Sequence, residues 1–174
     1  LGGGRNNCIA SSGDLNTIGG GKENDIISTN GCNTIGGGQS NVISSAAQNS
    51  TIGGGASNNI VGTNSNVIAG GAINCMDSAS DYATIGGGLC NCTIGGDYAT
   101  IGGGCQNSAS GHRSGILGGF GNCTSHGCSM IIGVDITTQG NCTTHVNNLN
   151  FYAYDNNVTT LGTAEASGEV LYYG

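Results

Sequence analysis

One repeat dominates the sequence, and its period limits what the chain can fold into. Each copy has an apolar anchor, two or three small residues that are mostly glycine, and Asn six positions after the anchor. Successive anchors are 15 to 17 residues apart. The anchors are Leu1, Ile18, Ile35, Ile52, Ile68, Ile85, Ile101 and Ile116, with a degenerate ninth copy at Ile131. The Asn residues are Asn7, Asn24, Asn41, Asn58, Asn74, Asn91, Asn107 and Asn122. Self-similarity at a fixed period predicts a stack of equivalent units.

A second apolar position follows each Asn by two residues. It is occupied by Ile9, Ile26, Ile43, Ile60 and Met76, and fades to Thr93, Ala109 and Thr124. A helical repeat needs about 30 or more residues for its helix pair, whereas 15 to 17 residues allow two short strands and two turns. The sequence therefore predicts an all-β fold, a β-solenoid of about eight coils. Coils stacked about 4.8 Å apart would form a rod of about 40 Å.

The Asn column is interpreted as structural. Identical amides one strand spacing apart can hydrogen-bond along the stack, and Asn also tolerates the positive φ of a turn. A row of ligand-binding amides is the functional alternative.

The glycine runs predict a close approach of other backbone. Three successive glycines are unfavourable in a strand, because each loses extra backbone entropy and packs nothing. We expect the approaching backbone to belong to a second chain, since a coil this short has a thin interior and lateral association would bury more apolar surface.

Charge excludes some partners. Only 7% of residues are charged, and three basic residues against ten acidic ones give a net charge of −7. A nucleic-acid-binding protein needs a basic surface instead, so nucleic acid is not expected as a partner.

No apolar run approaches the length of about 20 residues that spans a bilayer, so no membrane insertion is expected. Because the chain begins inside a repeat at Leu1, we expect it to be a piece of a longer polypeptide.

Two segments carry a family resemblance. Residues 107–119 (NSASGHRSGILGG) and 82–88 (YATIGGG) resemble the head repeats of trimeric autotransporter adhesins of the YadA type. That resemblance implies a left-handed parallel β-roll in a homotrimer. The sequence departs from the family in its longer period, its glycine triplets and its Cys content.

The repeats as a whole are also similar to the repeat regions of tail-fibre and appendage proteins of bacteriophages and larger aquatic viruses. This resemblance includes the Cys-rich corners and the segments 129–133 (SMIIG) and 143–150 (TTHVNNLN). It implies a virion fibre and supplies no catalytic residue.

The anchors stop near residue 136, which divides the chain into a solenoid region, 1–135, and a C-terminal segment, 136–174. Five of the eight aromatic residues lie in the second part, in segments 151–154 and 172–173. Alternating apolar and polar residues there predict strands, so we expect a small β cap or a neck that leads to a further domain. The Tyr cluster is interpreted as a buried seam between chains, with a sugar-stacking site as the alternative.

Nine Cys residues raise the question of disulfides. They replace Asn, Ser or Gly of sister repeats, so reduced, packing Cys residues are expected. Cys75 and Cys92 occupy one column in neighbouring coils, and directly stacked parallel residues are expected to have poor geometry for a disulfide.

One constellation resembles a metal site. Cys123 and His126 form one CxxH-like pair, and Cys142 and His145 form another about one coil later. Zinc takes four such ligands, but no Cys-x2-Cys pair accompanies them, and polar turn residues are the preferred interpretation. No metal and no cofactor is therefore predicted.

Catalytic residues are not predicted either. Asp14, Asp81 and Asp97 share a column four residues before their anchors, which suggests an acidic stripe of the kind that can hydrolyse glycosides, or simply a solvated polar face. The residue before the anchor is usually Thr, which suggests an ice-binding face as an alternative. The high β propensity of Thr explains the same pattern. An ice-binding face would also need a second file of Thr, and glycine occupies that position.

The sequence thus predicts a non-enzymatic fibre segment on a virion or an extracellular surface, acting as a rigid spacer or adhesin in host attachment. The expected partners are two further copies of the chain and a cell-surface receptor or glycan. A bacterial trimeric adhesin head is the nearest alternative. A polysaccharide-cleaving spike and an ice-binding solenoid are alternatives of other classes.

Overall fold

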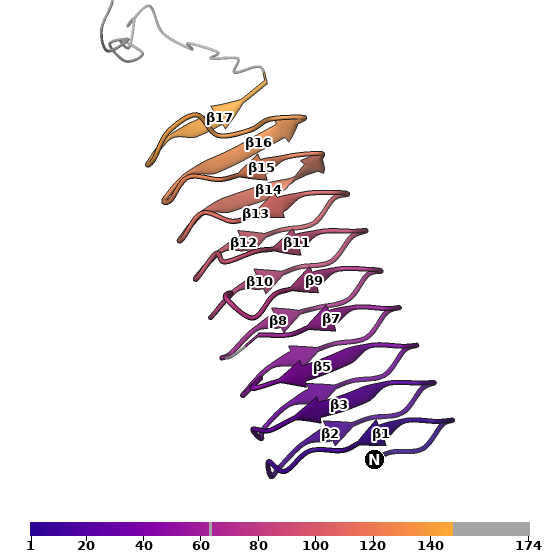
Figure 1. Ribbon diagram of the computed structural model, residues 1–174. Helices are drawn as coiled ribbons and strands as arrows, with labels where there is room; N and C mark the ends of the chain where they lie inside the picture. The colour runs from indigo at the N-terminus through magenta and orange to yellow at the C-terminus, as the bar shows by residue number, and fades with distance from the viewer. Residues whose placement is uncertain (63, 148–174) are drawn as a thin grey trace, which may run out of the picture.

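The chain forms a β-solenoid of about nine turns, seen in a computed structural model that describes residues 1–62 and 64–147 (Figure 1). The described residues contain strands and turns and no helix. Each turn contributes one short strand to each of two parallel sheets. The predicted all-β solenoid is confirmed.

From β1 to β16 the strands alternate between the two sheets along the chain, and β17 follows β16 in the same sheet. Sheet A holds β2 (Thr17–Ile18), β4 (Thr34–Ile35), β6 (Thr51–Ile52), β8 (Val67–Ile68), β10 (Thr84–Ile85), β12 (Thr100–Ile101), β14 (Gly115–Phe120), β16 (Met130–Val134) and β17 (Thr144–Val146). Sheet B holds β1 (Cys8–Ile9), β3 (Asp25–Ser28), β5 (Val42–Ser45), β7 (Asn59–Ile60), β9 (Cys75–Met76), β11 (Cys92–Thr93), β13 (Ser108–Ala109) and β15 (Cys123–Thr124).

The register of both sheets is the register of the sequence repeat. In sheet A, Ile35 lies between Ile18 and Ile52, and in sheet B, Ile43 lies between Ile26 and Ile60. Because side chains alternate between the two faces of a strand, a slip of one residue would turn the whole apolar file outward. The anchors therefore fix the register.

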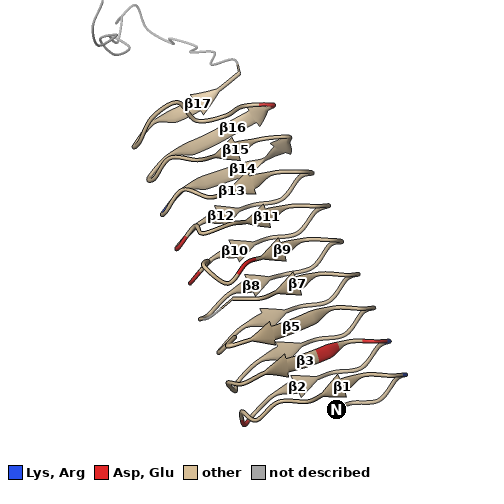
Figure 2. Ribbon diagram, in the orientation of Figure 1, with Lys and Arg blue, Asp and Glu red and all other residues tan. Residues whose placement is uncertain are grey.

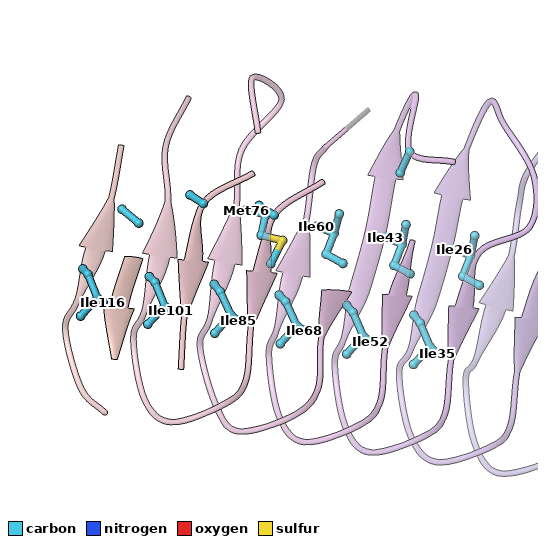
Figure 3. Close-up of a cluster of buried hydrophobic side chains, with 14 of the residues drawn as sticks. Ile26, Ile35, Ile43, Ile52, Ile60, Ile68, Met76, Ile85, Ile101 and Ile116 are labelled. Carbon is cyan, nitrogen blue, oxygen red and sulfur yellow. The ribbon is translucent and has the colours of Figure 1, made fainter. Parts of the chain in front are cut away.

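The core consists of two files of side chains that face each other between the sheets (Figure 3). The anchors from Ile18 to Ile116 are at most 1% exposed, and Ile131 continues their file. Figure 3 shows the facing file of Ile26, Ile43, Ile60 and Met76. Leu1 is the exception among the predicted anchors: it is 70% exposed and lies outside the core, because it stands at the end of the stack with a neighbouring coil on one side only.

The facing file becomes thinner toward the C-terminal end. After Met76 the buried positions in sheet B are Thr93, Ala109 and Thr124. The Thr124 hydroxyl is hydrogen-bonded to the Ser114 hydroxyl at 2.8 Å, which satisfies both groups in the interior. Smaller side chains accompany shorter coils, so the interior of the solenoid shrinks along the rod.

Two kinds of corner connect the sheets. The glycine corner runs from each sheet A strand to the next sheet B strand, as in residues 36–41, and the variable corner runs from sheet B back to sheet A, as in residues 46–50. From anchor to facing residue there are eight positions in every coil from Ile18 to Thr124. The return to the next anchor takes nine positions after Ile26 but only seven after Thr124. All the variation in coil length over this range therefore falls in the variable corner.

The solenoid continues beyond residue 135, where the sequence predicted its end. β17 pairs in parallel with β16, and His145 is the register partner of Ile131. The sheet thus includes residues that we had expected in a separate C-terminal segment, because the position of an anchor can be filled by a residue that is not aliphatic. The rest of that segment, 148–174, with its Tyr cluster, lies outside the described residues.

Candidate functional site

The Asn column forms a continuous hydrogen-bonded ladder along the glycine corner. The side-chain oxygen of each Asn accepts the backbone N–H of the Asn in the next coil. Asn24 Oδ1 accepts from Asn41, and Asn41 Oδ1 accepts from Asn58, both at 3.0 Å. The amide nitrogen of Asn58 donates to Asn41 Oδ1 at 3.1 Å and to the carbonyls of Gly54 and Gly71 at 3.0 Å. These amides are buried and use their hydrogen-bonding groups on one another and on the glycines. They are therefore closed to a ligand.

The positive φ at this corner belongs to the residue before the Asn, not to the Asn itself. Glu23, Ser40 and Ile73 have φ between 54° and 58°. Our expectation that Asn supplies the turn conformation is corrected accordingly: Asn is required by its amide, and the preceding position adopts the left-handed conformation whatever its side chain.

The first and third glycines of each triplet are explained by contacts inside the chain. A Cβ added to Gly38, whose φ is +89°, would lie 2.1 Å from the carbonyl oxygen of Gly55 in the next coil. At Gly36 it would lie 2.3 Å from the oxygen of Gly53. The backbone that approaches these two glycines is the neighbouring coil of the same chain, so these positions do not require a second chain. A Cβ at the middle glycine of a triplet, such as Gly103, would meet nothing within 4 Å.

The variable corner carries most of the diverse chemistry of the molecule. Its central residue has φ between 52° and 63° in each coil and donates its backbone N–H to the coil before, as Tyr98 does to Asp81 at 2.8 Å. The central residues are Leu15, Cys32, Asn49, Ser65, Tyr82, Tyr98, Arg113, Cys128 and Cys142. Hydrogen bonds of this kind hold very different side chains in one column on one edge of the rod.

This column was missed in the sequence, although its neighbour gives a signal. The residue after the central residue is buried in every coil from Asn33 to Ser129, and it is Asn at positions 16, 33 and 66. Asn16 Oδ1 accepts the N–H of Asn33, and Asn66 Oδ1 accepts that of Ala83, both at 3.0 Å. Asn two positions before three of the anchors was the available sign of this second, interrupted ladder.

The predicted acidic stripe is a short row of two carboxylates. Asp81 Oδ1 accepts the N–H of Asn64, and Asp97 Oδ1 accepts that of Asp81, both at 3.0 Å. His112 Nδ1 lies 3.4 Å from Asp97 Oδ2. Asp14 belongs to the same column but stands four coils from Asp81. Both carboxylates of the pair cap the backbone of a neighbouring coil, which is a structural role.

Two aromatic rings stack beside this row. Tyr82 and Tyr98 have ring centroids 5.1 Å apart and an interplanar angle of 6°, and both side chains are about half exposed. Parallel stacking of this kind is a favourable aromatic arrangement when the rings are offset. It also shows that exposed side chains on adjacent coils of this column contact each other directly.

Charged residues are rare on the sheets. Among the described strands only β3 contains one, Asp25, and Figure 2 shows the remaining charges along the edges of the ribbon. In sheet A, Thr17, Thr34 and Thr51 pair in one outward column beside a column of glycines. The single Thr file anticipated from the sequence is therefore present, with glycine in the neighbouring file.

Cys75 and Cys92 form a disulfide between adjacent coils. Their Cα atoms are 4.7 Å apart, within the range of about 4.4 to 6.8 Å that a disulfide tolerates. The expectation that stacked parallel residues could not be bridged, and that the Cys residues are reduced, is therefore wrong for this pair. The other seven Cys residues are free thiols.

The four residues of the suggested metal site are not brought together. Cys123 lies in sheet B, Cys142 at the variable corner and His145 in sheet A. His126 Nδ1 is 3.1 Å from the Thr138 hydroxyl, and His145 Nε2 is 2.8 Å from the Thr143 hydroxyl. Within residues 1–62 and 64–147, no three His, Cys, Asp or Glu side chains are grouped so that they could hold a metal ion.

Apolar side chains gather on the surface of the C-terminal coils. Leu117 is 66% exposed on the outer face of sheet A, and Ile132 and Val134 line a shallow depression beside it. Phe120 and Leu89 are also exposed, at the glycine corner. Contiguous exposed apolar surface of this kind is typical of an interaction face.

Comparison with protein-family models and with curated proteins finds no match for this chain. In the part of the chain that the structure describes, no helix has the length and apolar character needed to cross a membrane.

Proposed function

We propose that this chain is a non-enzymatic segment of an elongated fibre on a virion or another extracellular surface, and that its coils act as a rigid spacer in attachment. The observation that carries the proposal is the in-register stack: both sheets, the core files and the Asn ladder repeat at every coil along one axis. In such an array each unit contacts only its neighbours, so the number of coils sets the length of the rod.

The proposed assembly is a homotrimer. With the first and third glycines of the triplets accounted for inside the chain, the trimer is supported by the resemblance to adhesin and tail-fibre repeats and by the exposed apolar residues Leu117, Ile132 and Val134. These side chains would be buried if copies associated along the C-terminal part of sheet A. Only the resemblance supports a left-handed coil and a receptor or glycan partner.

The oligomeric state is tested by light scattering on the purified chain, with and without reductant. We expect a mass near three times 17.0 kDa under both conditions, because the observed disulfide lies within one chain. Leu117→Asp should lower the mass to that of a monomer, whereas Leu15→Asp, at an exposed corner far along the rod, should leave it unchanged. A wild-type monomer would contradict the trimer.

The spacer role is tested by removing one coil. Deletion of residues 35–51 joins Thr34 to Ile52 and restores the same sheet A pair, so the chain should fold into a rod shorter by about 4.8 Å. Deletion of residues 35–42 removes half a coil and places sheet B residues in the sheet A column, so it should prevent folding. Circular dichroism and small-angle X-ray scattering report both outcomes. A whole-coil deletion that fails to fold would contradict a modular spacer.

A further inference from the structure

Two free thiols face each other near the C-terminal end of the variable corner. Cys128 and Cys142 are the central residues of adjacent coils, with φ of 56° and 57°. Each is held by a backbone hydrogen bond to the preceding coil, from Cys128 N–H to the His112 carbonyl at 2.8 Å and from Cys142 N–H to the Gly127 carbonyl at 2.9 Å. Both side chains are exposed.

The two side chains are neighbours in this column, because each residue occupies the central position of its coil. The neighbouring Cys128 side chain raises the pKa of the Cys142 thiol, through a hydrogen bond and through its charge. The same column brings the Tyr82 and Tyr98 rings to a centroid distance of 5.1 Å. Side chains of adjacent coils therefore come into direct contact on this edge of the rod.

The chain itself shows that Cys residues of adjacent coils can be bridged. Cys75 and Cys92 are paired in register in neighbouring strands and form a disulfide across a Cα–Cα distance of 4.7 Å. Cys128 and Cys142 are likewise one coil apart in one column, at the corner instead of in a sheet. The third Cys of that column, Cys32, lies between Leu15 and Asn49 and has no thiol beside it.

We infer that Cys128 and Cys142 are a second inter-coil disulfide site, which a small-molecule disulfide such as oxidised glutathione converts from dithiol to disulfide. The thiolate of one Cys attacks a sulfur of the oxidised glutathione and releases one molecule of reduced glutathione. The thiolate of the other Cys then attacks the mixed disulfide and releases the second. Two protein thiols are oxidised to one disulfide, one glutathione disulfide is reduced, and their two protons pass to the two glutathione thiols.

The bond would fasten the coil that leads into β17 to the coil that precedes it in the chain. The closed loop, residues 128–142, contains β16 and the Asn141 side chain, whose oxygen accepts the N–H of Gly127 at 2.9 Å. β17 begins two residues after Cys142 and pairs with β16. Cross-linking restricts the opened state of such a loop, so this end of the rod would resist local opening when oxidised.

The site is tested by peptide mapping of the full chain after equilibration with reduced and oxidised glutathione and quenching with an alkylating agent. Cleavage before Asp gives the fragment 135–154, which contains only Cys142, and the fragment 97–134, which contains Cys105, Cys123 and Cys128. We expect these fragments to be linked by a disulfide in the wild type and in Cys32→Ser and Cys123→Ser. The link should be lost in Cys128→Ser. The Cys75 to Cys92 link provides the internal reference for oxidation.

Two results would overturn the inference. One is a Cys142 that is alkylated or carries glutathione under conditions in which Cys75 and Cys92 are fully linked. The other is a link that persists in Cys128→Ser. Amide hydrogen exchange gives an independent readout: amides of β17 should exchange at least about tenfold more slowly in the oxidised wild type than in Cys128→Ser, while those of β2 should not change.

Discussion

The two corners of each coil both connect the two sheets, but one has nearly the same sequence in every coil and the other varies. The glycine corner keeps one length and one Asn amide through eight coils, whereas the variable corner changes length and presents Leu, Cys, Tyr or Arg at one position. Both place a left-handed residue before a buried one and tie it to the preceding coil. The difference is that the glycine corner is bound by side-chain hydrogen bonds at every coil, and the variable corner mainly by its backbone. The glycine corner must therefore keep the same sequence in every coil, because its Asn ladder must remain unbroken. The variable corner can accept different side chains, because its backbone makes most of its hydrogen bonds.

The largest expected effect that tests this difference is a methyl group in the glycine corner. Gly104 has φ of +90°, and a Cβ there would lie 2.2 Å from the carbonyl oxygen of Gly119. We expect Gly104→Ala to lower the free energy of unfolding by about 3 kcal/mol or more, from backbone strain and displacement of the next coil. Gly103→Ala is the matched control, since a Cβ at Gly103 meets nothing within 4 Å, and it should change stability by less than about 0.5 kcal/mol. Urea denaturation measures both, and equal losses would contradict the close-approach explanation.

The next effect compares the two ladders. Asn58 makes three side-chain donations and accepts from the backbone and side chain of Asn74. Asn58→Ala should cost about 3 kcal/mol, because it leaves buried partners unsatisfied. In the variable corner, Asn66→Ala should cost only about 1 kcal/mol, since the amide nitrogen of Asn66 lacks a hydrogen-bond partner among the described residues and Ala83 fills the same position one coil later. A larger loss at Asn66 than at Asn58 in denaturation experiments would reverse our ranking of the corners.

The smallest effect is a gain in stability. Ile73 is a β-branched residue at φ of 58° and is 55% exposed, and such residues are strained in this conformation. Ile73→Asn should therefore raise the free energy of unfolding by about 1 kcal/mol. Ile94→Asn is the control, because Ile94 is equally exposed and is not among the positive-φ residues. If both substitutions shift the melting temperature alike, the gain comes from surface polarity and not from relief of strain.

The sequence was sufficient for the repeat, the all-β class and the two core files. Isoleucine at a fixed spacing can be buried in only one register, and Asn at a fixed offset marks a corner. The sequence could not show which backbone approaches the glycines, since a neighbouring coil and a neighbouring chain require the same small residue. The short distance between a Cβ at Gly38 and the carbonyl oxygen of Gly55 makes that distinction.

Other features depended on distances that no composition encodes. The disulfide of Cys75 and Cys92 follows from the Cα separation of two stacked strands. The central residues of the variable corner share a backbone conformation but no side-chain type, as Leu15, Tyr82 and Cys142 illustrate. Their column became visible only when the coils were superimposed in register, and it contains the thiol pair and the aromatic stack.

The Asn ladder also gives the rod a polarity. Every bond between two Asn residues runs one way: the N–H of the later residue points to the side-chain oxygen of the earlier one, from Asn24 to Asn7 and onward to Asn122. Aligned amides polarise one another in the same sense, so the two ends of the stack are chemically unlike, one offering acceptors and the other donors. A filament that extended this ladder from unit to unit would have to grow head to tail, with all its members pointing in the same direction.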